Sequence, residues 1–217
     1  MIPQRDVIPS RTTPYITVGI IVINAIAWLF EIGLPRDALS IFLKLYGVVP
    51  SALRAPTLIT SMFLHGSWSH ILGNMWYLWI FGDNVEDRFG HGRFAVFYLL
   101  CGIVAALAQV AMDPASTIPT IGASGAIAGV MGAYFVMYPR SRVLTLVPLI
   151  IFWDIIELPA IVLLGLWFVL QLFNSTTIAA AANARGGVAF AAHVAGFAIG
   201  AVGVFAFRKR ARRGWDA

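Results

Sequence analysis

The chain has 217 residues, of which 59% are hydrophobic and only 12% are charged. A soluble domain carries about 25% charged residues, so this composition excludes most soluble enzymes, a disordered chain and a collagen-like fibre. The single cysteine, Cys101, excludes an internal disulfide bond. We therefore expect a polytopic membrane protein whose solvent is the lipid bilayer.

Six apolar stretches are predicted to cross the bilayer as helices. In chain order they cover residues 15–34, 70–82, 94–112, 124–138, 159–173 and 188–207. Residues 35–69 and 143–156 are broken by prolines and are expected to lie at the membrane interface, the second of them on the inner side. The predicted fold class is an all-α membrane protein with a six-helix bundle over residues 15–207. Residues 1–14 form a cytoplasmic N-terminal segment without a signal-peptide pattern, and residues 208–217 form a basic cytoplasmic tail.

The basic residues predict the orientation of this bundle. With both termini inside, the inner segments hold Arg5, Arg11, Arg88, Arg93, Arg140, Arg142, Arg208, Lys209, Arg210, Arg212 and Arg213, whereas the outer segments hold Arg36, Lys44, Arg54 and Arg185. This asymmetry satisfies the positive-inside rule. A basic run directly after a long apolar span is typical of a cytoplasmic membrane flank, so we expect no nucleic-acid partner.

Polar side chains occur at matching depths in three of the predicted spans. At about 1.5 Å per helical residue, Ser124 and His193 each lie about 21 Å from the inner end of their spans, and His70 lies about 18 Å from the inner end of its span. Asn74 follows His70 by four residues, so both side chains point from one helix face. Because polar groups inside lipid are costly, their presence there indicates a functional site.

The surroundings of Ser124 suit nucleophilic catalysis. In Gly122-Ala123-Ser124-Gly125 the serine follows a turn-rich loop and opens a helix. Free backbone N–H groups and the positive end of the helix dipole there favour a developing oxyanion. An ordinary helix-capping serine is the alternative.

Small residues explain how Ser124 and His193 would meet. Gly125 and Gly129 on one span, and Gly196 and Gly200 on another, have the spacing that lets two helices approach closely. Close packing without chemistry remains an alternative, as do helix–helix hydrogen bonds for His193, His70 and Asn74. No Asp or Glu occurs between residues 158 and 215, so the pattern predicts a Ser-His dyad rather than a triad.

Other membrane functions fit the sequence less well. A metal-dependent protease would need a ligand set such as His-Glu-x-x-His, which is absent, so no metal or cofactor is expected. A channel or transporter would show inverted repeats or paired broken helices.

Taken together, the motifs resemble the rhomboid intramembrane serine proteases in their compact six-span bacterial form. The resemblance rests on His65-x4-His70-x3-Asn74, on Gly122-Ala123-Ser124-Gly125, and on Ala192-His193-Val194-Ala195-Gly196 followed by Gly200. It implies cleavage of transmembrane protein substrates near the outer leaflet, with Ser124 as nucleophile and His193 as general base. It also implies oxyanion stabilisation by His70, Asn74 and the Ser124 backbone N–H. An inactive relative of this family would lack the serine or the histidine, and here both are present.

The resemblance leaves some positions with other residues. Ala128 stands where some bacterial members have an aromatic residue against the catalytic histidine, so we expect His193 to be held in a different way. The Trp-Arg pair common in the first outer loop is not evident in residues 35–69. His65 is expected to support the connection before the second span. Trp167 and Phe173 either belong to a side gate against the second span or are lipid-facing or packing aromatics. Compactness and the lack of a transit peptide favour a prokaryotic plasma membrane.

Overall fold

The computed structural model describes residues 1–148, 153–180 and 189–208, with the backbone alone for residues 148, 153 and 175–180. Predictions that involve residues 149–152, Arg185, Val188 and the tail beyond Arg208 lie outside this part. Long helices dominate the fold, and their bounds are α1 (Tyr15–Ile32), α4 (Trp68–Phe89), α5 (His91–Met112), α6 (Ser124–Met137), α7 (Ala160–Ala180) and α8 (Phe190–Phe207). Shorter pieces follow α1, namely α2 (Arg36–Tyr46), η1 (Pro50–Ala52), α3 (Thr57–Thr60) and η2 (Ser61–Phe63).

Three of the helices, α1, α5 and α8, are long and apolar enough to cross a membrane. The helix α6 and the apolar part of α7, Ala160–Asn174, are shorter. The helix α4 has 22 residues, and its last turns carry charges. The structure therefore contains six long helices in its described part, and which of them cross the bilayer stays a prediction.

The expectation of an all-α fold is wrong in one respect. The strands β1 (Ile2–Asp6), β2 (Arg142–Pro148) and β3 (Trp153–Pro159) form an antiparallel sheet in the order β1-β2-β3. Residues of β2 alternate in exposure, with Val143 and Thr145 buried and Leu144 half-buried, which is the period of a strand. Segments too short and too often broken by proline to span a membrane can still pair as strands when each finds a partner.

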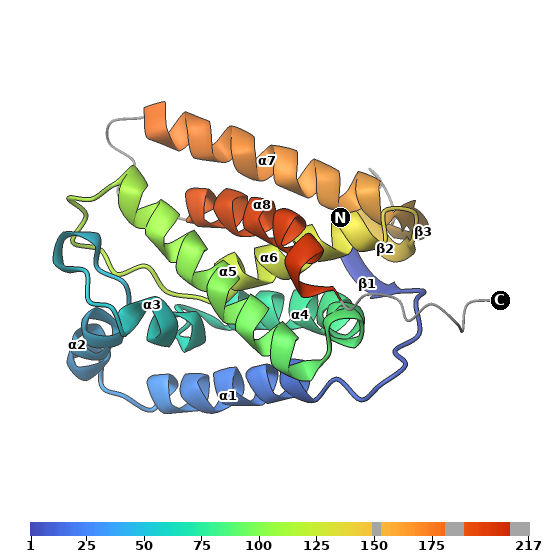
Figure 1. The fold of residues 1–217 in the computed structure, drawn as a ribbon. Helices are drawn as coiled ribbons and strands as arrows, with labels where there is room; N and C mark the ends of the chain where they lie inside the picture. Colours follow the sequence, from blue (N-terminus) through green and yellow to red (C-terminus); the bar gives the residue numbers. More distant parts are fainter. Residues whose placement is uncertain (149–152, 181–188, 209–217) are drawn as a thin grey trace.

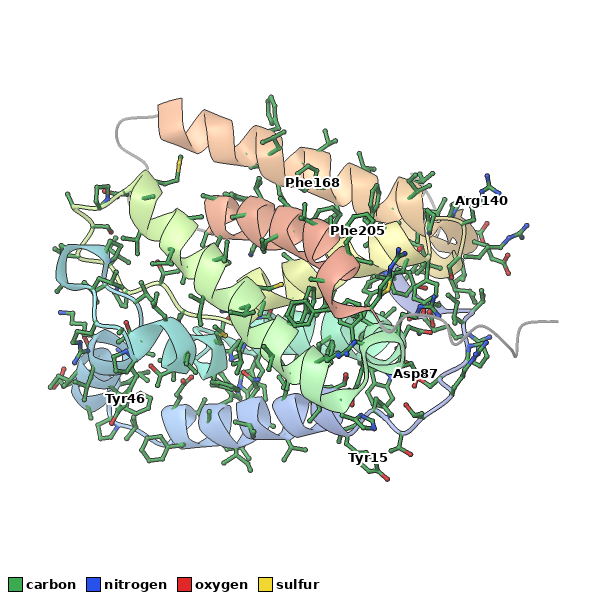
Figure 2. The ribbon with its side chains drawn as sticks, in the orientation of Figure 1. Tyr15, Tyr46, Asp87, Arg140, Phe168 and Phe205 are labelled. Carbon is green, nitrogen blue, oxygen red and sulfur yellow. The ribbon has the colours of Figure 1, made fainter. Side chains whose placement is uncertain are left out.

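The sheet lies at the end of the bundle where α6 ends and α7 begins, which we call the sheet end (Figure 1). Figure 2 shows Asp87 and Arg140 near this end and Tyr46 at the opposite end. The N-terminal segment belongs to the same fold, because Ile2 of β1 pairs with Leu146 of β2.

A buried carboxylate of α4 caps the first helix. The Glu86 carboxylate accepts hydrogen bonds from the backbone N–H groups of Ile16 at 2.9 Å and Thr17 at 2.8 Å, and from the Thr17 hydroxyl at 2.8 Å. The first N–H groups of a helix lack intrahelical partners and attract negative charge. Glu86 therefore satisfies the start of α1, and His91 Nδ1 lies 2.6 Å from the same side chain.

The helix α6 is the centre of the bundle, since every residue from Gly125 to Tyr134 is buried. Its closest neighbour is α8. A Cβ atom added at Gly200 would collide with the Gly129 carbonyl oxygen, and one at Gly196 would collide with the Gly125 carbonyl oxygen. The two glycine faces named in the sequence therefore meet backbone to backbone, as small residues allow.

Asp6 connects the sheet to the bundle. Its Oδ2 accepts hydrogen bonds from the Tyr134 hydroxyl at 2.7 Å and from Asn84 Nδ2 at 2.9 Å. Burial raises the pKa of Asp6 to about 6; the nearby Asp83 charge adds to this rise, and the Tyr134 hydrogen bond opposes it.

This raised pKa predicts a pH-dependent stability. Between its ordinary pKa of 3.8 and about 6, the folded protein keeps the Asp6 proton that the unfolded chain releases, so stability falls as pH rises through this window. We expect the unfolding temperature of the wild type, relative to Asp6→Asn, to fall between about pH 4 and pH 6 and then to level off. Thermal unfolding in detergent measures it, with Asp113→Asn at an exposed position as the control. Parallel wild-type and Asp6→Asn curves would contradict the prediction.

Candidate active site

Ser124 and His193 meet between α6 and α8. Ser124 is the first residue of α6, and His193 lies one turn into α8. Ser124 Oγ lies 2.8 Å from His193 Nε2, a normal hydrogen-bond length. The histidine is only 8% exposed, and the close approach of the glycine faces beneath it sets the spacing. A hydroxyl hydrogen-bonded to a buried imidazole is the arrangement that activates a serine nucleophile.

The second ring nitrogen of His193 also has a partner. Gln171 Oε1, on α7, lies 2.8 Å from His193 Nδ1. The sequence predicted no carboxylate at this position, and Gln171 was not among the predicted site residues.

Aromatic rings enclose the same histidine. The Trp167 ring of α7 lies 5.8 Å from the His193 ring between centroids, and the Phe190 ring lies 6.4 Å away. Trp167 also lies 6.1 Å from Phe197. Because Ala128 carries no ring, the aromatic contact to His193 comes from α7 and α8 rather than from α6.

His70 and Asn74 face the turn before the nucleophile. Gly122 has a φ of 121°, which side chains rarely adopt. A Cβ atom there would lie 2.6 Å from His70 Nε2 and 3.8 Å from Asn74 Nδ2. The glycine therefore leaves open the space into which both side-chain nitrogens point.

The hydrogen bonds of His70 determine which nitrogen carries its proton. Its Nδ1 accepts a hydrogen bond from the Gly66 backbone N–H at 3.4 Å. In a neutral imidazole the other nitrogen then carries the hydrogen, so Nε2–H is directed at the space beside Gly122. Asn74 is 8% exposed, and its Nδ2 has no hydrogen-bond partner among the described residues. Two donors thus border the serine turn, and the Asn74 amide has no acceptor among the described residues.

His65 lies behind His70. It is 1% exposed, its backbone N–H donates to Glu31 Oε2 at 3.1 Å, and its ring contacts the His70 ring edge-on at 5.0 Å. Burial, aided by the neighbouring His70, lowers the pKa of His65 to about 3. The neutral His65 side chain lies against the His70 ring, and its supporting role stays a prediction. In the described part of the chain, no group of three or more His, Cys, Asp or Glu side chains is placed to hold a metal ion.

Comparison with known proteins gives the family. The family model for the rhomboid domain matches residues 53–210, which include every site residue named above. The chain belongs to the rhomboid family.

Rhomboid proteins of several sources resemble this chain. It is 38% identical over 85 residues to the rhomboid protease GluP of Bacillus subtilis, a match that covers 39% of this chain and 16% of that protein. It is 29% identical over 130 residues to the putative rhomboid protease YdcA of the same bacterium, covering 58% of this chain and 64% of that protein. RHOMBOID-like protein 5 of Arabidopsis thaliana is 34% identical over 76 residues, covering 35% of this chain and 25% of that protein.

The matched stretch spans at most a quarter of the length of each of the first four relatives. Some of the relatives are mitochondrial or chloroplastic by name. The rhomboid family and the apolar helices make this chain an integral membrane protein.

Gln171 is the rhomboid site residue that sequence reasoning missed. A signal was present, because Gln171 is the only amide or charged side chain in residues 159–173, and a polar group within a span indicates function. A prediction of a third member based on carboxylates alone does not include this amide. An amide oxygen accepts a hydrogen bond from Nδ1–H as a carboxylate does.

Proposed function

We propose that this rhomboid protein is an intramembrane serine endopeptidase that uses a Ser124-His193 dyad. The observation that carries the proposal is the 2.8 Å hydrogen bond between Ser124 Oγ and His193 Nε2 in a buried site. The rhomboid protease names of the bacterial relatives support the same reaction class.

The peptide-bond chemistry follows from these two groups. Ser124 Oγ attacks the scissile carbonyl carbon while His193 Nε2 takes the hydroxyl proton, and the tetrahedral intermediate then collapses when His193 returns that proton to the leaving amine. Water, deprotonated by the same nitrogen, then attacks the acyl carbon, and as the ester bond breaks His193 returns this proton to Ser124 Oγ, which restores the serine. His193 Nε2 thus accepts the proton that each attacking oxygen releases.

An oxyanion site completes the proposed machinery. His70 Nε2–H, Asn74 Nδ2 and the Ser124 backbone N–H at the start of α6 are the donors we assign to it. They border the same turn, and the Asn74 amide lacks another acceptor among the described residues. Preorganised donors of this kind stabilise the developing negative charge.

Asn74→Ala is therefore expected to lower kcat by about 10²–10³-fold, because one oxyanion donor is lost. Steady-state cleavage of a single-span substrate in detergent measures the loss. Asn84→Ala, which removes an amide at the sheet end of the same helix, is the control. A rise in KM with unchanged kcat would show that Asn74 binds substrate and does not stabilise the oxyanion.

We further propose six membrane spans with the sheet end in the cytoplasm. The described basic residues near that end are Arg5, Arg11, Arg88, Arg93, Arg140, Arg142 and Arg208. Basic segments favour the cytoplasmic side, and α6 places Ser124 about 20 Å from the sheet end. Cleavage would then occur towards the outer leaflet, and the bacterial relatives support a prokaryotic plasma membrane as its location. Residues 15–207 would form the protease domain, flanked by residues 1–14 and 208–217.

Incubating the purified protein with a single-span substrate, beside Ser124→Ala, tests the proposal. We expect cleavage by the wild type only, at a bond near the outer end of the substrate span when fragments are mapped by mass spectrometry. A fluorophosphonate probe should label the wild type and not the variant. Equal cleavage by both proteins would refute the protease assignment.

A further inference from the structure

The inference concerns Gln171 and rests on the proposed function. Each ring nitrogen of His193 takes part in one hydrogen bond of 2.8 Å, with partners on two different helices. One partner is the proposed nucleophile on α6, and the other is the side-chain amide of Gln171 on α7. We propose that Gln171 is a positioning residue that holds His193 in its reactive tautomer and ring orientation.

The hydrogen-bond directions determine the tautomer. To act as a base towards Ser124, His193 Nε2 must present a lone pair, so in the neutral ring Nδ1 carries the hydrogen. An Nδ1–H needs an acceptor, and Gln171 presents Oε1 to it. Rotation of the ring by half a turn would lose both bonds together, so the amide opposes the unreactive orientation.

A neutral acceptor suits this location. When Nε2 takes the serine proton, the ring becomes positively charged, and the Gln171 carbonyl dipole stabilises that charge. A carboxylate would do so more strongly but would place a full negative charge in the bundle throughout the cycle, which is costly within a membrane. No acidic residue occurs between residues 158 and 215; the amide supplies an acceptor without that cost.

Two side chains on one face of α7 contact His193. Gln171 follows Trp167 by four residues, so the two side chains share one face of α7, and the Trp167 ring lies 5.8 Å from His193. The neighbouring Leu170 is 50% exposed and points elsewhere. One face of α7 therefore supplies His193 with a ring contact and a hydrogen bond, and α7 lies along α8 at the side of the bundle (Figure 1).

Three substitutions separate positioning from packing. Gln171→Leu keeps the volume and removes the acceptor, Gln171→Glu keeps an acceptor oxygen at the same reach, and Gln171→Asn keeps an amide one methylene too short. We expect Gln171→Leu and Gln171→Asn to lower kcat by about 10- to 100-fold with little change in KM, because misplacing a catalytic group by about 1 Å costs about this much. Gln171→Glu should recover most of the lost kcat. Leu170→Ala on the same helix turn is the control and should match the wild type.

The measurements are kcat and KM for a single-span substrate, and the rate of fluorophosphonate labelling at Ser124, with thermal unfolding to show that each variant is folded. If Gln171 only packs the helices, the order reverses: Gln171→Leu matches the wild type and Gln171→Glu is the least active. That order, or a change in KM alone, overturns the positioning role while leaving the dyad intact. If Gln171→Leu fails to fold, Gln171→Asn decides by the same criteria. Labelling that persists in Ser124→Ala would instead overturn the proposed function, and the role of Gln171 with it.

Discussion

Ser124→Ala, His193→Ala and the double variant are expected to share nearly the same residual rate, about 10⁵–10⁶-fold below the wild type. The reason is that Ser124 Oγ and His193 Nε2 form one hydrogen-bonded unit. Without the imidazole the hydroxyl proton has no acceptor, and without the hydroxyl the imidazole has no nucleophile to activate. Once either group is absent, removing the other therefore costs little more.

Quantitative cleavage of a single-span substrate by the four proteins measures this non-additivity. Ser51→Ala, at an exposed serine remote in sequence from the site, is the matched control and should retain wild-type activity. Losses that multiply in the double variant would mean that the two residues act independently. The dyad would then be incorrect even though each residue matters.

Gly200→Ala is expected to reduce activity by more than about 10²-fold and to destabilise the fold by about 1–3 kcal/mol. An added methyl group would overlap the Gly129 carbonyl oxygen and would lie 2.5 Å from its Cα. Because the obstacle is backbone and not a flexible side chain, α8 itself must move away from α6. That movement separates His193 from Ser124, whose 2.8 Å bond tolerates little displacement.

Gly73→Ala is the control for this experiment. Gly73 lies on α4 between His70 and Asn74, and a methyl group there would meet nothing within 4 Å. In an exposed helix interior, alanine in place of glycine is neutral or stabilising. Unfolding temperature and kcat are the two measurements. A Gly200→Ala protein with wild-type stability and activity would show that α6 and α8 do not need backbone contact.

The agreement between predicted and observed helices shows which part of the fold follows from local sequence. Apolar runs and their breakers located all six long helices, with most ends within a few residues of those in the structure. The sheet was missed because strand pairing is not local: Asp6 of β1 pairs with Val143 of β2, far along the chain. A short apolar run with proline indicates only that a helix cannot continue, and the partner strand decides what forms in its place.

In the candidate site, too, some features follow from the local sequence and others only from the tertiary structure. The sequence by itself determined the family, which the domain match confirms, and it singled out Ser124, His193, His70 and Asn74 because residue type, i to i+4 spacing and depth along a helix are local properties.

Only the tertiary structure decided which helix faces His193 from the side, and hence that Gln171 lies where the sequence predicted no partner. It also decided that the Gly66 backbone N–H turns the His70 Nε2–H towards Gly122. Such pairings depend on how whole helices and loops pack, and no short stretch of chain contains that information. The lack of acidic residues between 158 and 215 therefore determined that no carboxylate from this stretch lies beside His193, and the packing of α7 on α8 placed the Gln171 amide there instead.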